Sequence, residues 1–437
     1  MAFYRGIELG NSYREYRKRL AARGETYPKF SQDGLSILYD FDSTVIDTGS
    51  IQSILPDNTA NLTFTRASSG SYLDSDGILK FAGPNQPRIT YDLSGSLKGI
   101  ITGPQQTNYF RNSDPTSDPG QGTRTNLTYI SDQTGLGFDG NIELPPNSGA
   151  VSRYINCNTL PSGSYTIAAI VKNDTLAEPV FTNANHNAND FIFFIEGYLT
   201  TYPPNLVNYV SHKTKYIGNG VYLCQAWGIA NNNTSTFGID NRASKSTGNT
   251  TYITGFMVFE GHVEVELEDY IKTEGSAVTR NADIVDVEEV QPLIGQNEGT
   301  IFISGIYKFN NEIEGIFSVY NGFTDYITLQ SWNIEGSLVV QSLVNSQLQF
   351  NSLYSTPLQD GDRFKLALRY KDGSYHIYIN GVLRYQITGK STDFIDLQDI
   401  SIGKILTGQS PTRQYYDSFR LYKRGLTDAE LITLTTL

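Results

Sequence analysis

Hydrophobic and polar residues alternate along much of the chain, and this period of two predicts β-strands. The clearest run is Phe364–Tyr370, where every second residue is large and hydrophobic and the residues between are Lys, Ala and Arg. Asp372-Gly373 and Asn380-Gly381 follow this run. Such pairs supply the positive φ angles that tight hairpins need. The segment therefore predicts consecutive hairpins in a sheet with one buried face.

Similar strand patterns occur from residue 33 almost to the end, separated by turns rich in Asn, Gly and Ser. The strands predicted before and at the start of the last block are Gly34–Phe41, Ser164–Lys172, Asp190–Leu199, Gly220–Ala230, Thr251–Gly261 and Thr300–Phe309. Their spacing favours two-sheet sandwiches or jelly rolls. The fold class expected is all-β, built from tandem β-sandwich or jelly-roll modules.

Two short helices are expected, one near each end. Ser12 and Glu15 form a capping-box pattern that opens a helix over residues 13 to 23, and Thr427 with Glu430 does the same near the C-terminus. A helix as short as the first is marginal alone in water, so we expect it to pack on a partner or on the body of the protein.

Charge separates the beginning of the chain from the remainder. Residues 1 to 30 contain seven basic and three acidic side chains, a net charge of +4. The net charge of the whole chain is −12, so residues 31 to 437 together carry −16. This segment could dock on an acidic protein surface, and the alternative is an ordinary solvated helix. The residues expected to dock are Tyr13, Arg14, Tyr16, Arg17, Lys18 and Leu20. The predicted divisions are a basic segment at 1–30, a β leader at 31–115, a jelly roll at 116–285 and a sandwich at 286–437.

Composition excludes several classes of protein. No stretch of 18 apolar residues exists, so no transmembrane helix is predicted, and the N-terminus lacks the apolar core of a secretory signal. The acidic body disfavours nucleic acid as the main partner. No nucleotide-binding fingerprint occurs, and the two cysteines, Cys157 and Cys224, are too few for a zinc motif. We expect no cofactor. We expect both cysteines to be small buried residues, and the alternative is a cross-link between them.

The last block resembles the laminin-G-like or concanavalin-like sandwich. The resemblance rests on "FKLALRYKDGSYHIYINGVL" (Phe364–Leu383), "DISIGK" (Asp399–Lys404) and "YDSFRLYKRGLTDAEL" (Tyr416–Leu431). The middle block resembles the carbohydrate-binding-like jelly rolls of phage virion proteins through its closing "DYIKTEGSAVTRNADIV" (Asp269–Val285).

The leader resembles the start of the same virion proteins. The matching stretches are "TFTRASSGSYLDSDG" (Thr63–Gly77), "PNQPRITYD" and "QTNYFRNS"; Gln86 stands where that family often has Glu. The resemblance covers roughly residues 60 to 437. It implies a tailed-phage fibre, spike or decoration protein that is assembled in the bacterial cytoplasm and exposed on the particle. Such proteins often bind surface glycans and often form trimers.

Two stretches could in principle carry chemistry. Asp74-Ser75-Asp76-Gly77 looks like part of a calcium loop, but an EF-hand alignment puts Tyr72 at position 1 and Gly83 at position 12, so an Asx-type turn is the simpler prediction. "EVELE" (Glu264–Glu268) would place three carboxylates on one face of a strand. That pattern resembles the acid motif of concanavalin-fold glucanases, but the middle acid there is usually Asp and the stretch lies in the wrong module. We expect a solvent-facing strand and no catalysis.

Glycan binding would use aromatic side chains near turns, with neighbouring amides and carboxylates holding the sugar hydroxyls. The candidates are Tyr320, Asn321, Phe323, Tyr326, Trp332, Tyr415 and Tyr416. Arg66 and Arg280 are expected to be structural, each tying a strand end through paired hydrogen bonds to a carboxylate or a carbonyl.

Three functions follow as hypotheses. The first is a virion protein that docks on other virion proteins by its N-terminus and binds host-surface glycans. The second is a purely structural head, neck or tail joint or decoration protein. The third is a polysaccharide-degrading enzyme. The sequence does not distinguish head, neck or tail attachment, and it leaves the oligomer and the receptor open.

Overall fold

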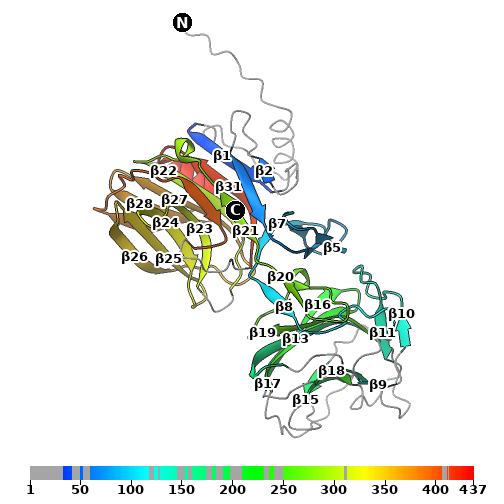
Figure 1. The fold of residues 1–437 in the computed structure, drawn as a ribbon. Helices are drawn as coiled ribbons and strands as arrows, with labels where there is room; N and C mark the ends of the chain where they lie inside the picture. Colours follow the sequence, from blue (N-terminus) through cyan, green and yellow to red (C-terminus); the bar gives the residue numbers. More distant parts are fainter. Residues whose placement is uncertain are drawn as a thin grey trace, which may run out of the picture.

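A computed structural model of the chain describes residues 33–41, 50–52, 60–117, 123–125, 128–144, 153–155, 160–173, 180–183, 190–196, 209–230, 236–240, 250–309, 313–405, 411 and 413–437. Within these residues the fold is all-β, and its strands gather into two lobes (Figure 1). The expected N-terminal helix, its docking residues and Cys157 lie outside the described residues. No helix in the described part of the chain is long and apolar enough to cross a membrane.

The terminal lobe is a sandwich of two sheets, each with eight strands. Sheet A runs in the order β29 (Val382–Thr388), β28 (Ser374–Ile379), β27 (Arg363–Lys371), β22 (Gly299–Ile306), β31 (Gln414–Tyr422), β7 (Leu97–Thr102) and β6 (Ile89–Tyr91), with β1 (Leu35–Asp40) also paired to β31. Sheet B runs in the order β2 (Ser50–Gln52), β3 (Asn61–Thr65), β21 (Ile284–Val287), β30 (Asp399–Ile402), β23 (Glu314–Asn321), β24 (Asp325–Ser331), β25 (Ser337–Val344) and β26 (Gln347–Ser355).

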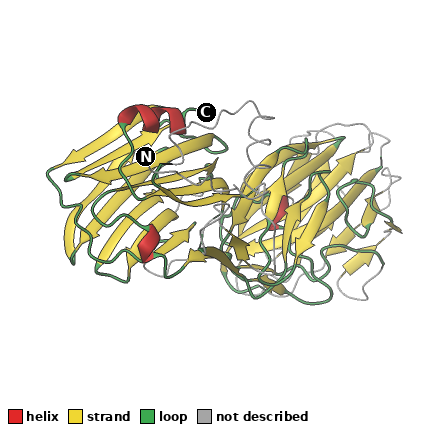
Figure 2. Cartoon of the chain, turned by 90° about the horizontal axis from the view of Figure 1, so that it is seen from above, coloured by secondary structure: helices red, strands yellow, loops and turns green. Residues whose placement is uncertain are grey.

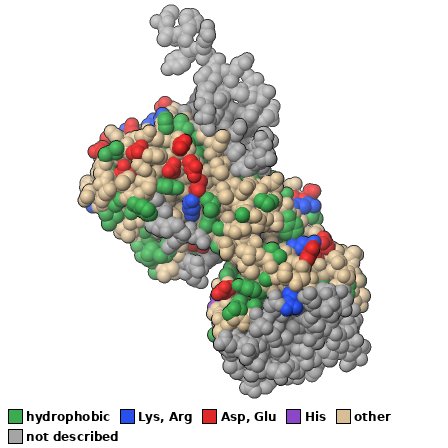
Figure 3. Space-filling model, viewed as in Figure 1, with side chains coloured by type: hydrophobic (Ala, Val, Ile, Leu, Met, Phe, Trp, Pro, Cys, Tyr) green, Lys and Arg blue, Asp and Glu red, His purple; other side chains and the backbone are tan. Residues whose placement is uncertain are grey.

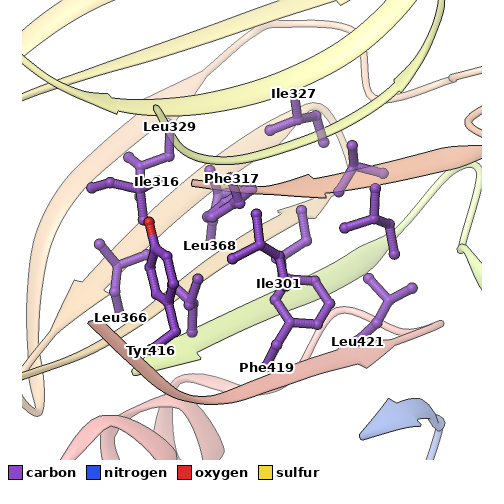
Figure 4. Close-up of a cluster of buried hydrophobic side chains, with 14 of the residues drawn as sticks. Ile301, Ile316, Phe317, Ile327, Leu329, Leu366, Leu368, Tyr416, Phe419 and Leu421 are labelled. Atoms are coloured by element: carbon purple, nitrogen blue, oxygen red, sulfur yellow. The ribbon is translucent and has the colours of Figure 1, made fainter. Parts of the chain in front are cut away.

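Alternating residues of the two sheets fill the space between them. Phe364, Leu366, Leu368 and Tyr370 of β27 are all buried, as their period of two predicts. They meet side chains such as Phe317 from the facing sheet (Figure 4). The two predicted hairpin turns have the expected positive φ angles, 48° and 72° at Asp372-Gly373 and 49° and 79° at Asn380-Gly381.

The leader is part of the terminal sandwich. β1 and β7 pair with the two halves of β31, and β3 pairs with β21 in sheet B. The sequence predicted module boundaries at residues 115 and 285. Strands from before the first boundary pair with strands from after the second, so the sheets do not follow these boundaries, and the division into modules stays a prediction. The sandwich that forms the terminal lobe needs residues from both ends of the chain.

The middle lobe has a six-stranded and a five-stranded sheet. The first has the order β10 (Thr128–Ile130), β11 (Asn141–Leu144), β19 (Thr251–Glu260), β13 (Gly163–Asn173), β17 (Val221–Ala230) and β16 (Tyr209–Gly218). The second has the order β14 (Val180–Asn183), β15 (Asp190–Glu196), β18 (Thr236–Asp240), β12 (Arg153–Ile155) and β9 (Thr123–Thr125). In the six-stranded sheet Cys224 and Leu223 are both fully buried, although their side chains belong to separate hydrophobic clusters. Both faces of this sheet are therefore covered.

Small elements complete the fold. Two two-stranded ribbons, β8 (Gln106–Asn108) with β20 (Val278–Arg280) and β4 (Gly70–Leu73) with β5 (Leu79–Ala82), lie where the lobes meet (Figure 1). Two 3-10 turns are η2 (Leu267–Asp269) and η3 (Gln291–Leu293). The helix α2 (Asp428–Thr435) covers the outer face of sheet A (Figure 2), and it opens with the predicted capping box of Thr427 and Glu430.

Candidate functional site

A single buried carboxylate, that of Asp283, joins the leader to the end of the middle lobe. Arg66 Nη1 lies 2.8 Å from Asp283 Oδ1. Arg280 Nη1 lies 3.3 Å from Asp283 Oδ2, and Arg88 donates to the same oxygen. All four side chains are fully buried. We call these four residues the Asp283 cluster.

Several further donors of the three arginines bind backbone carbonyls at strand ends and turns, and Arg280 Nη2 also donates to Gln106 Oε1. The carbonyl acceptors are those of Ser68, Ala82, Gly83 and Gln86 for Arg66, Ser71 and Glu268 for Arg88, and Pro104 for Arg280. Planar guanidinium groups suit this use because their donors diverge in a fixed fork. Arg66 and Arg280, which the sequence suggested as structural, thus tie β3, β5, β8 and β20 to one carboxylate.

The charges of the cluster depend on one another. Burial by itself would raise the pKa of Asp283, but Arg88, Arg280 and Arg66 outweigh burial and hold the pKa below its usual value. Burial, with help from Arg88, lowers the pKa of Arg280 to about 10, so Arg280 is still charged at neutral pH. Asp283 and Arg280 are therefore both charged at neutral pH, and loss of the carboxylate would leave buried positive charge without its partner.

A second buried group of charges lies at η2. The sequence predicted a solvent-facing strand at Glu264–Glu268, and the structure corrects this: Leu267–Asp269 form a 3-10 turn, and Glu266, Glu268 and Asp269 are buried. The Asp269 carboxylate accepts a hydrogen bond from the Glu266 backbone N–H at 2.9 Å, which closes the turn. Glu264, Glu266 and Glu268 therefore do not share one face of a strand, and of the three only Glu264 stays partly exposed, where it pairs with Lys213.

Basic side chains from the leader and the terminal lobe neutralise the η2 carboxylates. Lys98 Nζ lies 2.5 Å from Glu268 Oε1, and Lys308 Nζ lies 3.3 Å from Glu266 Oε1. Arg413, immediately before β31, is paired with Asp269. Lys215 of β16 pairs with Glu266 within the middle lobe, whereas these three cations come from sheet A or its flanks and meet carboxylates of the middle lobe. These ion pairs therefore bridge the lobes, and we call this region the junction.

The junction charges do not suit glycoside hydrolysis. A hydrolase needs an acid whose pKa is raised, beside a second carboxylate within reach of the sugar. Burial would raise the pKa of Glu266, but Lys215, Arg413, Lys308 and Lys98 lower it well below its usual range. A buried carboxylate that is kept ionised by four cations cannot act as a proton donor.

Tyr415 and Tyr416 do not lie at an exposed site, which corrects their selection as glycan-binding residues. Tyr416 belongs to the core between the sheets, and Tyr415 points to the junction, where Lys98 Nζ sits 3.9 Å from its ring centroid. Both are buried because β31 lies in the middle of sheet A and the η2 carboxylates lie beside its outer face. Adjacent strand residues face opposite sides, but here both sides are covered.

The other candidates gather at one rim of the terminal sandwich, with one exception. Asn321 and Phe323 lie at the turn between β23 and β24, and Tyr320 and Tyr326 are cross-strand neighbours just below it. Trp332 follows the far end of β24, about 20 Å away along the strand, so it does not belong to this group.

The rim combines exposed apolar side chains with fixed polar ones. Phe323 is 69% exposed, and Ile395 in a neighbouring loop is 66% exposed. Asn321 Nδ2 donates to Asp396 Oδ2 at 2.8 Å. The buried Asp325 carboxylate accepts from the backbone N–H of Ile395 at 3.1 Å, which holds the loop against the turn. We call Asn321, Phe323, Asp325, Ile395 and Asp396 the rim site.

The stretch that resembled a calcium loop is the predicted Asx-type turn. Asp74 Oδ1 accepts hydrogen bonds from the backbone N–H groups of Asp76 and Ile78, at 3.0 and 2.9 Å. The turn joins β4 to β5. Within the described residues, no group of three or more His, Cys, Asp or Glu side chains is arranged to hold a metal ion.

Comparison with known proteins gives no family. No family of known proteins and no curated sequence matches the chain. Among solved structures, the CBM40 domain of a Ruminococcus gnavus sialidase bound to α2,3-sialyllactose is 20% identical over 33% of this chain and 84% of that chain, with a TM-score of 0.29.

Other solved structures match to a similar degree. Domain 4 of an extracellular arabinanase from Geobacillus stearothermophilus, in complex with arabinotriose, is 17% identical over 36% of this chain and 73% of that one, with a TM-score of 0.28. A pentraxin from Limulus polyphemus is 17% identical over 31% and 68%, with a TM-score of 0.25. Likenesses at this level identify neither a fold family nor a ligand.

Proposed function

We propose that this chain is a structural protein of a tailed-phage virion, that it docks on the particle through residues 1 to 30, and that it binds host-surface glycans at the rim site. The virion part rests on sequence motifs. The leader motif and the closing motif resemble those of phage proteins, and their residues Arg66, Arg88, Arg280 and Asp283 form one cluster. That convergence supports reading the motifs as one structural unit.

The rim site carries the glycan-binding part of the proposal. Sugars bind proteins through apolar contact with a ring face and hydrogen bonds to hydroxyl groups. Phe323 and Ile395 offer exposed apolar surface, while Asn321 and Asp396 offer amide and carboxylate groups on the same rim. The Asp325 carboxylate accepts hydrogen bonds from the backbone N–H groups of Asn345 and Ile395, and so fixes the loops that contain these two residues. A site whose loops are already fixed loses less conformational entropy when a ligand binds.

The second candidate is a joint or decoration protein without sugar binding. The junction favours it, because buried ion pairs between the lobes hold them in one orientation. A rigid two-lobed body suits a protein that spans its neighbours in a particle. Under this alternative the rim site would face another virion protein.

Purified full-length chain on an array of host polysaccharides tests the proposal. Binding to at least one polysaccharide is expected, with loss of binding when Phe323 is replaced. If the chain binds none of the host polysaccharides, glycan binding is contradicted and the joint or decoration protein becomes the favoured function. The enzyme hypothesis predicts release of reducing ends from the same polysaccharides, abolished by Glu266→Gln; the burial and pairing of Glu266 predict no release.

A further inference from the structure

Three sheets in the described part of the chain end in a long edge strand, and these three edges differ in charge. β16, β29 and β26 have ten, seven and nine residues and lie at sheet margins, whereas the strands at the other ends of the four large sheets have three or four and β1, bonded to β31 alone among the described strands, has six. An edge strand exposes unpaired N–H and C=O groups, and natural proteins protect such edges with charged side chains. β16 carries Lys213 and Lys215, and β29 carries Arg384. β26 carries no charged residue.

The absence of charge extends well beyond β26. All 24 residues from Gly336 to Gln359, which include β25 and β26, are uncharged, although the chain as a whole has a net charge of −12. Leu348 and Leu353 on β26 are 57% and 52% exposed. The surface over these strands shows hydrophobic and uncharged polar side chains (Figure 3).

This edge is preformed. Phe350 of β26 packs into the core, and the Tyr354 ring lies 3.9 Å from that of Tyr385 in β29, so β26 is anchored to both sheets. Among the described strands only β25 pairs with β26, and Figure 1 shows β26 on the side of the terminal lobe away from the middle lobe. A strand that binds here would meet an ordered backbone.

We propose that β26 pairs with β26 of a second copy of this chain, antiparallel, and so joins sheet B of the two copies into one sheet. Charge selects this occupant. Two copies with a net charge of −12 repel each other over most of their surface, so they associate best where charge is absent. An antiparallel strand pair around a two-fold axis is also self-complementary, since each copy offers the same donors, acceptors and leucines.

The proposal sets both the size and the strength of the assembly. An isologous contact around a two-fold axis joins two copies and no more, so the proposal predicts a dimer. The resemblance to virion proteins favours a trimer instead. One strand pair and its flanking side chains bury less than the roughly 1,600 Å² of a standard interface. We therefore expect a dimer with a dissociation constant of the order of micromolar.

Sedimentation of the full-length chain from about 0.1 to about 100 μM tests this proposal across the expected dissociation constant. The wild-type chain should pass from monomer to dimer, and amide exchange in β26 should slow in the dimer. Leu353→Lys and Leu348→Lys should each weaken dimerisation about tenfold or more, because they place like charges across the two-fold axis. Leu93→Lys is the matched control: Leu93 is 39% exposed in a leader turn, and this variant should dimerise like the wild type.

Thermal unfolding of each variant checks that it folds, and either β26 variant that folds is sufficient for the test. A wild-type chain that stays monomeric over the whole range would overturn the proposal. So would a dimer or trimer that forms equally well in a folded β26 lysine variant, since another surface would then join the copies.

Discussion

Arg66 Nη1 and Asp283 Oδ1 lie 2.8 Å apart although 217 residues separate them in the sequence, and both side chains are fully buried. Arg66 follows β3 of sheet B, and Asp283 immediately precedes β21, which pairs with β3. The pair thus fixes the point at which the chain re-enters the terminal sandwich after forming the middle lobe. The middle lobe is thus inserted between two strands, β3 and β21, that pair in the terminal sandwich.

Replacing Asp283 with Asn should destabilise the protein strongly. The change leaves Arg66, Arg88 and Arg280 buried with one counter-charge fewer, and breaking a buried charge pair costs about 3–5 kcal/mol. Urea unfolding measures the loss. Asp139→Asn is the matched control: Asp139 pairs with Lys272 at the surface and should cost at most about 1 kcal/mol. Equal effects of the two changes would contradict a special role for the Asp283 cluster.

Replacing Arg413 with Met should uncouple the lobes. The variant leaves Asp269 without its buried partner from the terminal lobe. Calorimetry of the wild type should show one cooperative transition, whereas the variant should unfold in two steps, with the middle lobe separated from the terminal lobe.

Lys404→Met is the control for Arg413→Met, because the Lys404–Asp286 pair lies within the terminal lobe. This control should keep a single transition. Two transitions in the wild type, or one in Arg413→Met, would show that the junction does not couple the lobes.

Stability should fall on acidification. The pKa values of Asp283 and Glu266 are lowered in the folded protein, mainly because nearby cations outweigh burial. Their contribution is fully present above the unfolded pKa values of about 4, and it is lost as pH falls through the lower folded values. We expect these two groups to leave the free energy of unfolding in urea nearly the same at pH 7 and pH 5.5, and to lower it clearly below about pH 4. In Asp283→Asn this acid-dependent loss should be smaller.

Replacing Phe323 with Ala should weaken glycan binding. The variant removes the most exposed large hydrophobic side chain of the rim site, and loss of a stacking contact of about 1.4 kcal/mol reduces affinity tenfold. Phe81→Ala is the control, since Phe81 is 44% exposed on β5, outside the rim site. Binding isotherms on a polysaccharide that the wild type recognises give the comparison. Equal loss in both variants would argue against the rim site.

Deleting residues 1 to 30 should leave the two lobes folded and prevent incorporation into particles. The described strands of both lobes begin at Leu35, beyond this segment, and the segment's net charge of +4 contrasts with the acidic body. Circular dichroism of the truncated chain and quantitative immunoblots of purified particles measure the two effects. If the truncated chain is present in purified particles at the normal copy number, the docking proposal is wrong.

Local patterns predicted much of the fold. The alternation in Phe364–Tyr370, the two hairpin turns after it and the capping box before α2 all involve neighbours in sequence, so their geometry can be inferred from a few residues. The sequence predicts a single buried face for β27, and the face that bears Ala367 is the opposite one. It is instead partly covered, because Leu431 and Leu434 of α2 pack against Ala367.

The junction could not be predicted in this way. Glu266 and Glu268 alternate with apolar residues as in an exposed strand, but the cations that pair with them come from residues 98, 215 and 308, all distant in the sequence. A signal for the Asp283 cluster was present, since Arg88 and Asp283 stand within the motifs that resembled phage proteins. Only the fold shows that these motifs converge. Tyr415 looked exposed for the same reason: its cover comes from elsewhere in the chain.

Electron cryomicroscopy of the proposed phage particle tests the central proposal most directly. We predict density for the chain on the particle surface, with residues 1 to 30 against the particle and the rim site around Phe323 facing outward. Absence of the chain from purified particles would contradict the virion proposal. A rim site packed against another virion protein would contradict glycan binding there and favour the joint alternative.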